Sequence, residues 1–155
     1  MLAIYLNDHL AAATAACELA KRSAASNRGS SYGPFLDEVA GEIAADRETL
    51  QEIMRALDVR TDQLKVMGGW AGEKVGRLKL NGRLLGYSPL SRVVELEALA
   101  LGVRGKLGLW RALELIEPRY PALSRFVLGE LIARAERQLE GLEQHRLAAV
   151  EEAMG

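Results

Sequence analysis

Residues 35–57 read FLDEVAGEIAADRETLQEIMRAL, and this stretch decides the fold class. Its apolar residues recur at intervals of three and four, which places them along one face of an α-helix. The positions on this face are Leu36, Val39, Ile43, Asp46, Leu50, Ile53 and Leu57. Asp46 is the polar exception, so the stretch predicts an amphipathic helix with one carboxylate on its buried face.

Similar patterns predict helices on both sides of this stretch. We expect them over about 2–24, 90–117 and 122–153, with a helical crossover over about 61–83. In 2–24 the expected buried face consists of Leu2, Tyr5, His9, Ala13, Ala16 and Ala20, with His9 as its polar exception. Ser88-Pro89 is typical of an N-cap followed by proline at the first helical position.

Length and composition set the limits of the fold. The chain has 155 residues, which predicts one domain over 1–155. Two Trp, four Tyr, two Phe and four Pro are too few for a β-rich fold, so we expect an all-α protein. The net charge of −1 excludes a strong overall field toward nucleic acid or a membrane surface. Cys17 is the sole cysteine and is expected to be a packing residue in a cytoplasmic protein without a targeting segment.

The connection between residues 57 and 90 determines the topology. A helical segment of ~20 residues is ~30 Å long, about the length of the preceding helix. Such a segment returns the chain to the other end of the bundle, which predicts an up-down-down-up arrangement with one long crossover. A string of five helices that alternate in direction remains open.

Two stretches carry a family resemblance. YLNDHL at 5–10, and GRLLGYSPL at 82–90 followed by Glu95-Leu96-Glu97, resemble the ferritin-like four-helix-bundle superfamily, in particular a small bacterial branch of unassigned function. In catalytic members of that superfamily, Glu-x-x-His motifs and further carboxylates bind two iron or manganese ions. This chain has no Glu-x-x-His, since Thr49 follows Asp46 and Ala133 follows Glu130 at that spacing. We therefore expect no conventional di-iron centre and no cofactor, with iron or manganese at an altered site as the alternative.

Three residues are candidates for such an altered metal site: His9, Asp46 and Glu97. If the first two helices are antiparallel, His9 lies level with Asp46, and both occupy the expected buried faces. One interpretation is a buried His9–Asp46 hydrogen bond that fixes the helix register, because buried polar groups are normally paired. The other is a metal ligand set that includes Glu97.

Basic residues and glycines gather in the crossover. Lys74, Arg77, Lys79 and Arg83 are candidates for a phosphate or nucleic-acid site, although they can equally pair with the acidic stretch 35–59. Glycines recur in the crossover and in 90–117, at positions 68, 72, 76, 102, 105 and 108. They predict close backbone approach, or else a ligand that lies along the backbone.

The primary functional expectation is a non-enzymatic structural or interaction role. The alternatives are a metal-binding protein or oxidoreductase with an altered site, and a phosphate or nucleic-acid binder. Helix 90–117 is apolar nearly all round, so we also expect a homodimer that covers its surplus apolar surface. The expected core or interface anchors are Phe35, Trp70, Trp110 and Phe126.

Overall fold

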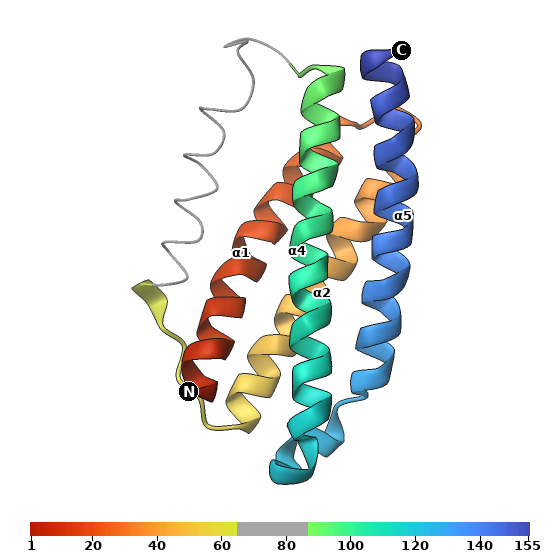
Figure 1. The fold of residues 1–155 in the computed structure, drawn as a ribbon. Helices are drawn as coiled ribbons and strands as arrows, with labels where there is room; N and C mark the ends of the chain where they lie inside the picture. Colours follow the sequence, from red (N-terminus) through yellow and green to blue (C-terminus); the bar gives the residue numbers. More distant parts are fainter. Residues whose placement is uncertain (65–86) are drawn as a thin grey trace.

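The computed structural model describes residues 1–64 and 87–155, which form four long α-helices (Figure 1). These are α1 (Leu2–Ser26), α2 (Gly33–Ala56), α4 (Pro89–Ile116) and α5 (Leu128–Met154). Two short 3-10 helices, η1 (Glu117–Arg119) and η2 (Pro121–Arg125), connect α4 to α5. None of the residues in the two described ranges lies in a strand, so the predicted all-α bundle is confirmed. Most of the expected crossover lies outside these ranges.

Hydrogen bonds at the two ends of α1 fix the directions of α2 and α4. Near the start of α1, Asn7 Nδ2 donates to Arg60 O at 3.0 Å, and Asn7 Oδ1 accepts from the Asp62 amide at 2.6 Å. At the end of α1, Asn27 Nδ2 donates to Tyr87 Oη at 2.6 Å. The chain thus leaves α2 beside the start of α1 and enters α4 beside its end, so α2 and α4 both run opposite to α1.

The C-terminal part of α5 lies at the same end of the bundle as the α1–α2 turn. Glu152 accepts from Tyr32 Oη at 2.9 Å and from Arg92 Nη1 at 2.7 Å. Helix α5 therefore runs parallel to α1, and Figure 1 shows α1 and α5 pointing one way and α2 and α4 the other. The described helices thus have the predicted up-down-down-up directions.

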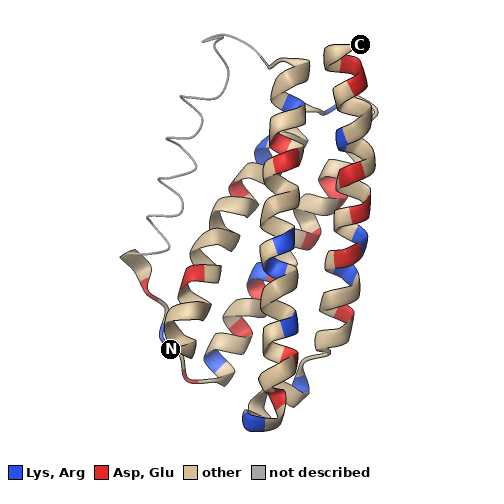
Figure 2. Cartoon of the chain, in the orientation of Figure 1, with Lys and Arg blue, Asp and Glu red and all other residues tan. Residues whose placement is uncertain are grey.

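Helices that are adjacent in the sequence make the closest packing. Backbone approach is most extensive between α4 and α5 and between α1 and α2, followed by α1 and α4, whereas α2 and α5 approach closely at few positions. Acidic and basic residues are interspersed along α4 and α5 (Figure 2). Of the helices in the described part of the chain, none is long and apolar enough to cross a bilayer.

The predicted buried face is confirmed on α2 and only in part on α1. On α2 every predicted position from Leu36 to Ile53 is buried, Asp46 included. On α1 the core residues are Leu6, Leu10, Cys17, Ala20 and Ala24. Ala20 belongs to the predicted face, whereas Leu6, Leu10 and Cys17 each follow a predicted position by one residue. Alanine residues occupy several faces of α1, so two neighbouring faces of this helix are almost equally apolar. The larger leucine side chains determine which of the two faces is buried.

The fourth long helix begins later than predicted. Instead of starting near residue 122, α5 starts at Leu128, and η2 precedes it. Leu123 in η2 is fully buried, which holds this turn against the end of the bundle. Phe126 then takes an extended conformation with φ −103° and ψ 131°, which separates η2 from α5.

The predicted aromatic anchors fall into two groups. Trp110 is a fully buried core residue, whereas Phe35 and Phe126 are half-buried and pack against the core. Trp70 lies outside the described residues. The prediction of a core anchor is thus confirmed most fully for Trp110.

Two helical glycines are expected to respond differently to alanine. A Cβ at Gly41 would meet nothing within 4 Å, so Gly41→Ala should raise the free energy of unfolding by ~0.5–1 kcal/mol through backbone entropy. A Cβ at Gly141 would lie 2.6 Å from Phe35 Cε2, which is too close for an unstrained contact. The resulting overpacking should cancel the entropic stabilisation in Gly141→Ala. Thermal unfolding of the two variants checks the order, and a more stable Gly141→Ala variant contradicts it.

Candidate functional site

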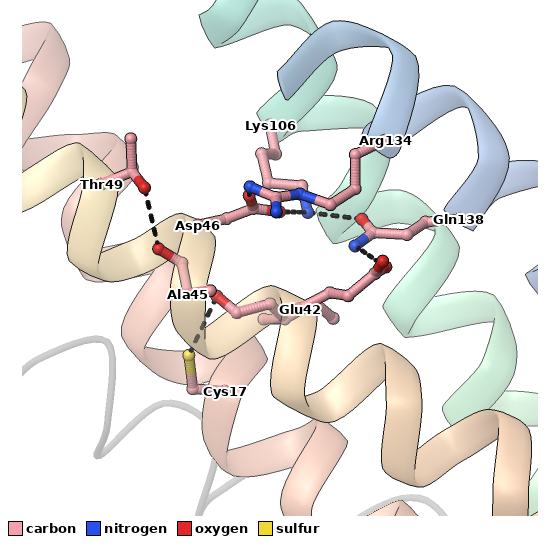
Figure 3. Close-up of polar contacts among 9 residues, drawn as sticks. Cys17, Glu42, Ala45, Asp46, Thr49, Lys106, Arg134 and Gln138 are labelled. Atoms are coloured by element: carbon pink, nitrogen blue, oxygen red, sulfur yellow. Dashed lines mark hydrogen bonds and ion pairs between the residues drawn. The ribbon is translucent and has the colours of Figure 1, made fainter. Parts of the chain in front are cut away.

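The carboxylate of Asp46 is the centre of the most buried group of charges. Asp46 projects from α2 into the bundle and is only 1% exposed. Lys106 Nζ, from α4, donates to Oδ2, and Arg134 Nη2, from α5, donates to Oδ1 (Figure 3). Each carboxylate oxygen therefore accepts from a cation on a different helix.

A glutamine extends these contacts to a second carboxylate. Lys106 Nζ also donates to Gln138 Oε1 at 2.5 Å, and Gln138 Nε2 donates to Glu42 Oε2 at 2.7 Å. We call these residues the ionic cluster: Glu42, Asp46, Lys106, Arg134 and Gln138. Its two acids and two bases balance in charge, and it ties α2 to both α4 and α5. Buried charges need such pairing, and their geometry can fix how helices align.

Burial dominates the electrostatics of Lys106. Loss of hydration lowers the pKa of the Lys106 ammonium from its ordinary value of 10.5, and Arg134 lowers it further. The Asp46 carboxylate raises this pKa and offsets part of the effect, with a smaller contribution from Glu42. Asp46 is therefore the main group that compensates for the burial of this positive charge.

A pocket of about 180 Å³ lies between α1, α2 and α4, beside the ionic cluster. Its polar lining residues are His9, Asp46, Arg47 and Lys106, together with the Trp110 indole. The remaining lining residues are small or aliphatic and include Ala12, Ala13, Ala16, Leu50, Leu101, Gly102 and Gly105. The pocket is thus an apolar space with a few polar groups, which is the usual composition of a small-molecule site.

The structure brings together two of the three predicted metal ligands. His9 and Asp46 both line the pocket. The expected hydrogen bond between them is not formed, and the Asp46 carboxylate accepts from Lys106 and Arg134 instead. The His9 ring instead lies edge-on to Tyr5, with ring centroids 4.5 Å apart.

Glu97 does not join His9 and Asp46. Its side chain is 50% exposed, and its Oε1 lies 3.6 Å from Arg146 Nη1. Position 97 follows the fully buried Leu96 by one residue, and this 100° step turns it away from the core. Within 1–64 and 87–155, no three His, Cys, Asp or Glu side chains gather as a metal site would require. The predicted basic site of Lys74, Arg77, Lys79 and Arg83 lies outside those ranges.

Sequence reasoning missed both cations that bind Asp46. A signal for Lys106 was present, because it follows buried Val103 by three residues and precedes buried Trp110 by four. That spacing places Lys106 on the largely apolar inner face of α4. Arg134 precedes fully buried Ala135, and its long side chain reaches inward from the edge of that face.

The imidazole of His9 is expected to titrate below the ordinary value of 6.5. Burial lowers the pKa of His9, and Asp8 opposes this effect in part. With the folded pKa below the unfolded one, the stability that His9 contributes is present above pH 6.5 and is lost as the pH falls through the folded pKa. An NMR titration checks the pKa, and His9→Gln should remove this part of the pH dependence of unfolding. A midpoint at or above 6.5 contradicts the prediction.

Comparisons of the chain with protein-family models, with curated proteins and with solved structures found no significant match.

Proposed function

We propose that the chain has a non-enzymatic structural or interaction role and forms no conventional di-iron centre. The observation that carries this proposal is the double engagement of the Asp46 carboxylate by Lys106 and Arg134. A metal ion at Asp46 would have to lie next to the positive charges of Lys106 and Arg134 or displace them from the carboxylate. Displacement would leave two partly buried cations without their partner, which is strongly unfavourable.

The ferritin-like relationship and a cytoplasmic location belong to the same proposal. The directions of the four described helices support the relationship, because ferritin-like bundles with one long crossover share them.

We further propose that the chain forms a homodimer through α4. Leu101 is 75% exposed and Leu115 is 81% exposed, and 14 residues are close to four helical turns, so both lie on one face. Light scattering at micromolar concentration should give twice the chain mass, and Leu101→Glu should shift the protein to monomer. A monomeric mass for the unaltered protein contradicts the dimer.

Metal analysis of protein purified without chelator tests the main proposal. We expect no metal at a fixed ratio to protein, with His9→Ala and the matched control His145→Ala equal to the unaltered chain. Stoichiometric iron or manganese that disappears in His9→Ala but not in His145→Ala would reverse the conclusion.

Two other functions remain as alternatives. His9 and Asp46 line the same pocket, and this favours a metal-binding protein or an oxidoreductase with an altered site. Phosphate or nucleic-acid binding through Lys74, Arg77, Lys79 and Arg83 is tested by a gel shift at ~50 mM salt, where phosphate contacts are strong. A salt-sensitive shift that is lost when these four residues are replaced would favour that alternative.

A further inference from the structure

The pocket between α1, α2 and α4 has the size of a small organic molecule. Its volume is about 180 Å³. An apolar cavity of ~150 Å³ in another protein is sufficient to bind benzene. A single six-membered ring with one small substituent, or a short alkyl chain, therefore fits the available space.

Small residues on two helices keep this space open. Alanines 12, 13 and 16 line it from α1, and Gly102 and Gly105 line it from α4. Among the described residues, a Cβ at Gly105 would meet nothing within 4 Å, and one at Gly102 would meet only Ala16 Cβ at 3.7 Å. In the described part of the chain, no backbone lies close to these two glycines, and most of the crossover that was expected to approach them lies outside the described ranges. Both glycines line the pocket.

A buried donor in the pocket lining lacks an acceptor. Trp110 is 1% exposed, and its indole Nε1–H has no hydrogen-bond partner among the described residues. Buried donors of folded proteins are nearly always paired with protein or ordered water. The indole ring lines the pocket, but its Nε1 has almost no accessible surface, so the N–H does not face the open space.

Arg47 gives the pocket a spare positive charge. This half-buried residue donates from Nε to Thr14 Oγ1 at 3.0 Å, and no carboxylate of the described ranges pairs with it. Asp46 is the acid among the lining residues, and Lys106 and Arg134 already engage both its oxygens. The planar guanidinium of arginine matches the two oxygens of a carboxylate.

From these observations we infer that the pocket binds a small apolar monocarboxylate. Arg47 pairs with the carboxylate, and the apolar body of the ligand fills the space between α1 and α4. The polar lining is richer in donors than in acceptors, which selects an acid over an amine of the same size.

Calorimetry with benzoate, hexanoate and uncharged benzyl alcohol at neutral pH tests the charge requirement. Benzoate or hexanoate should bind, and benzyl alcohol should bind at least about tenfold more weakly, as expected for loss of a charge-assisted contact. Arg47→Gln should remove this difference, whereas Arg55→Gln, an exposed arginine on the same helix, should leave it unchanged. Failure of both acids to bind, or equal binding of benzyl alcohol, overturns the inference.

Two leucine substitutions test the location. Gly105→Leu, on α4, places a side chain at the pocket and should abolish carboxylate binding. Gly41→Leu, on α2, is also at a position free of contacts within 4 Å but absent from the pocket lining, and it should preserve binding. Circular dichroism confirms that both variants are folded. Unchanged binding in folded Gly105→Leu overturns the assignment to this pocket.

Discussion

Replacing Asp46 with alanine is expected to lower the free energy of unfolding by about 3–5 kcal/mol. The substitution removes the carboxylate that accepts from both Lys106 and Arg134, and it leaves these two cations partly buried without compensation. Urea unfolding followed by circular dichroism at neutral pH measures the effect.

Two further variants separate the loss of pairing from the loss of a carboxylate in general. Asp37→Ala removes an exposed acid from the same helix and should change stability by less than ~0.5 kcal/mol. Replacing Asp46 with Leu, Lys106 with Met and Arg134 with Leu removes the charges together and should be close to neutral or stabilising. A loss below ~1 kcal/mol in Asp46→Ala would show that the ionic cluster does not depend on this carboxylate.

Replacing Asn27 with alanine is expected to lower the free energy of unfolding by about 2–4 kcal/mol. Asn27 is 1% exposed, and its Nδ2 donates to Ser23 O at 2.8 Å and to Tyr87 Oη at 2.6 Å. Its Oδ1 accepts from Arg92 Nε at 2.7 Å. The alanine variant removes these three hydrogen bonds, each worth a net ~0.5–1.5 kcal/mol, and leaves Arg92 Nε without its acceptor. Tyr87 Oη still donates to Glu95 Oε2 at 3.0 Å, and Ser23 O still accepts from the Asn27 amide at 3.1 Å.

The order of three variants checks this explanation. Tyr87→Phe removes one of the contacts of Asn27 and should cost ~1 kcal/mol. Ser26→Ala alters an exposed neighbour at the end of α1 and should have almost no effect. We expect Asn27→Ala to be the least stable, then Tyr87→Phe, then Ser26→Ala, and thermal unfolding at one fixed pH measures the order. Equal stability of Asn27→Ala and Ser26→Ala would contradict the role of Asn27 as a link between α1 and α4.

The helices were predictable where a single apolar face dominates the sequence. On α2 charged residues surround a narrow apolar face, so spacing alone identified the buried positions, including Asp46. On the alanine-rich helix α1, Leu6 and Leu10 make one face more apolar than its neighbour. Periodicity alone does not take side-chain volume into account, so it did not identify that face. The start of α5 was not predictable either, because Leu123 is held by tertiary packing rather than by a local signal.

Two residues of the candidate site were predictable, but Glu97 was misplaced and the partners of Asp46 were missed. Helix geometry placed His9 and Asp46 at one level, and both line the same pocket. The partner of Asp46 depended on which long basic side chains reach inward from α4 and α5. Lysine and arginine span several ångströms from backbone to charge, so a residue at the edge of a face can place its charge inside the bundle.

The close pairing of α1 with α2, and of α4 with α5, has a consequence for the order of folding events. Contacts between helices that are neighbours in the sequence require only short loops to close, so they form early in folding. Contacts between the α1–α2 pair and the α4–α5 pair require a longer loop to close and form later. The Asp46 contacts to Lys106 and Arg134 join one pair to the other, so we expect them to form after the main folding barrier. Weakening them should then accelerate unfolding and leave the folding rate almost unchanged.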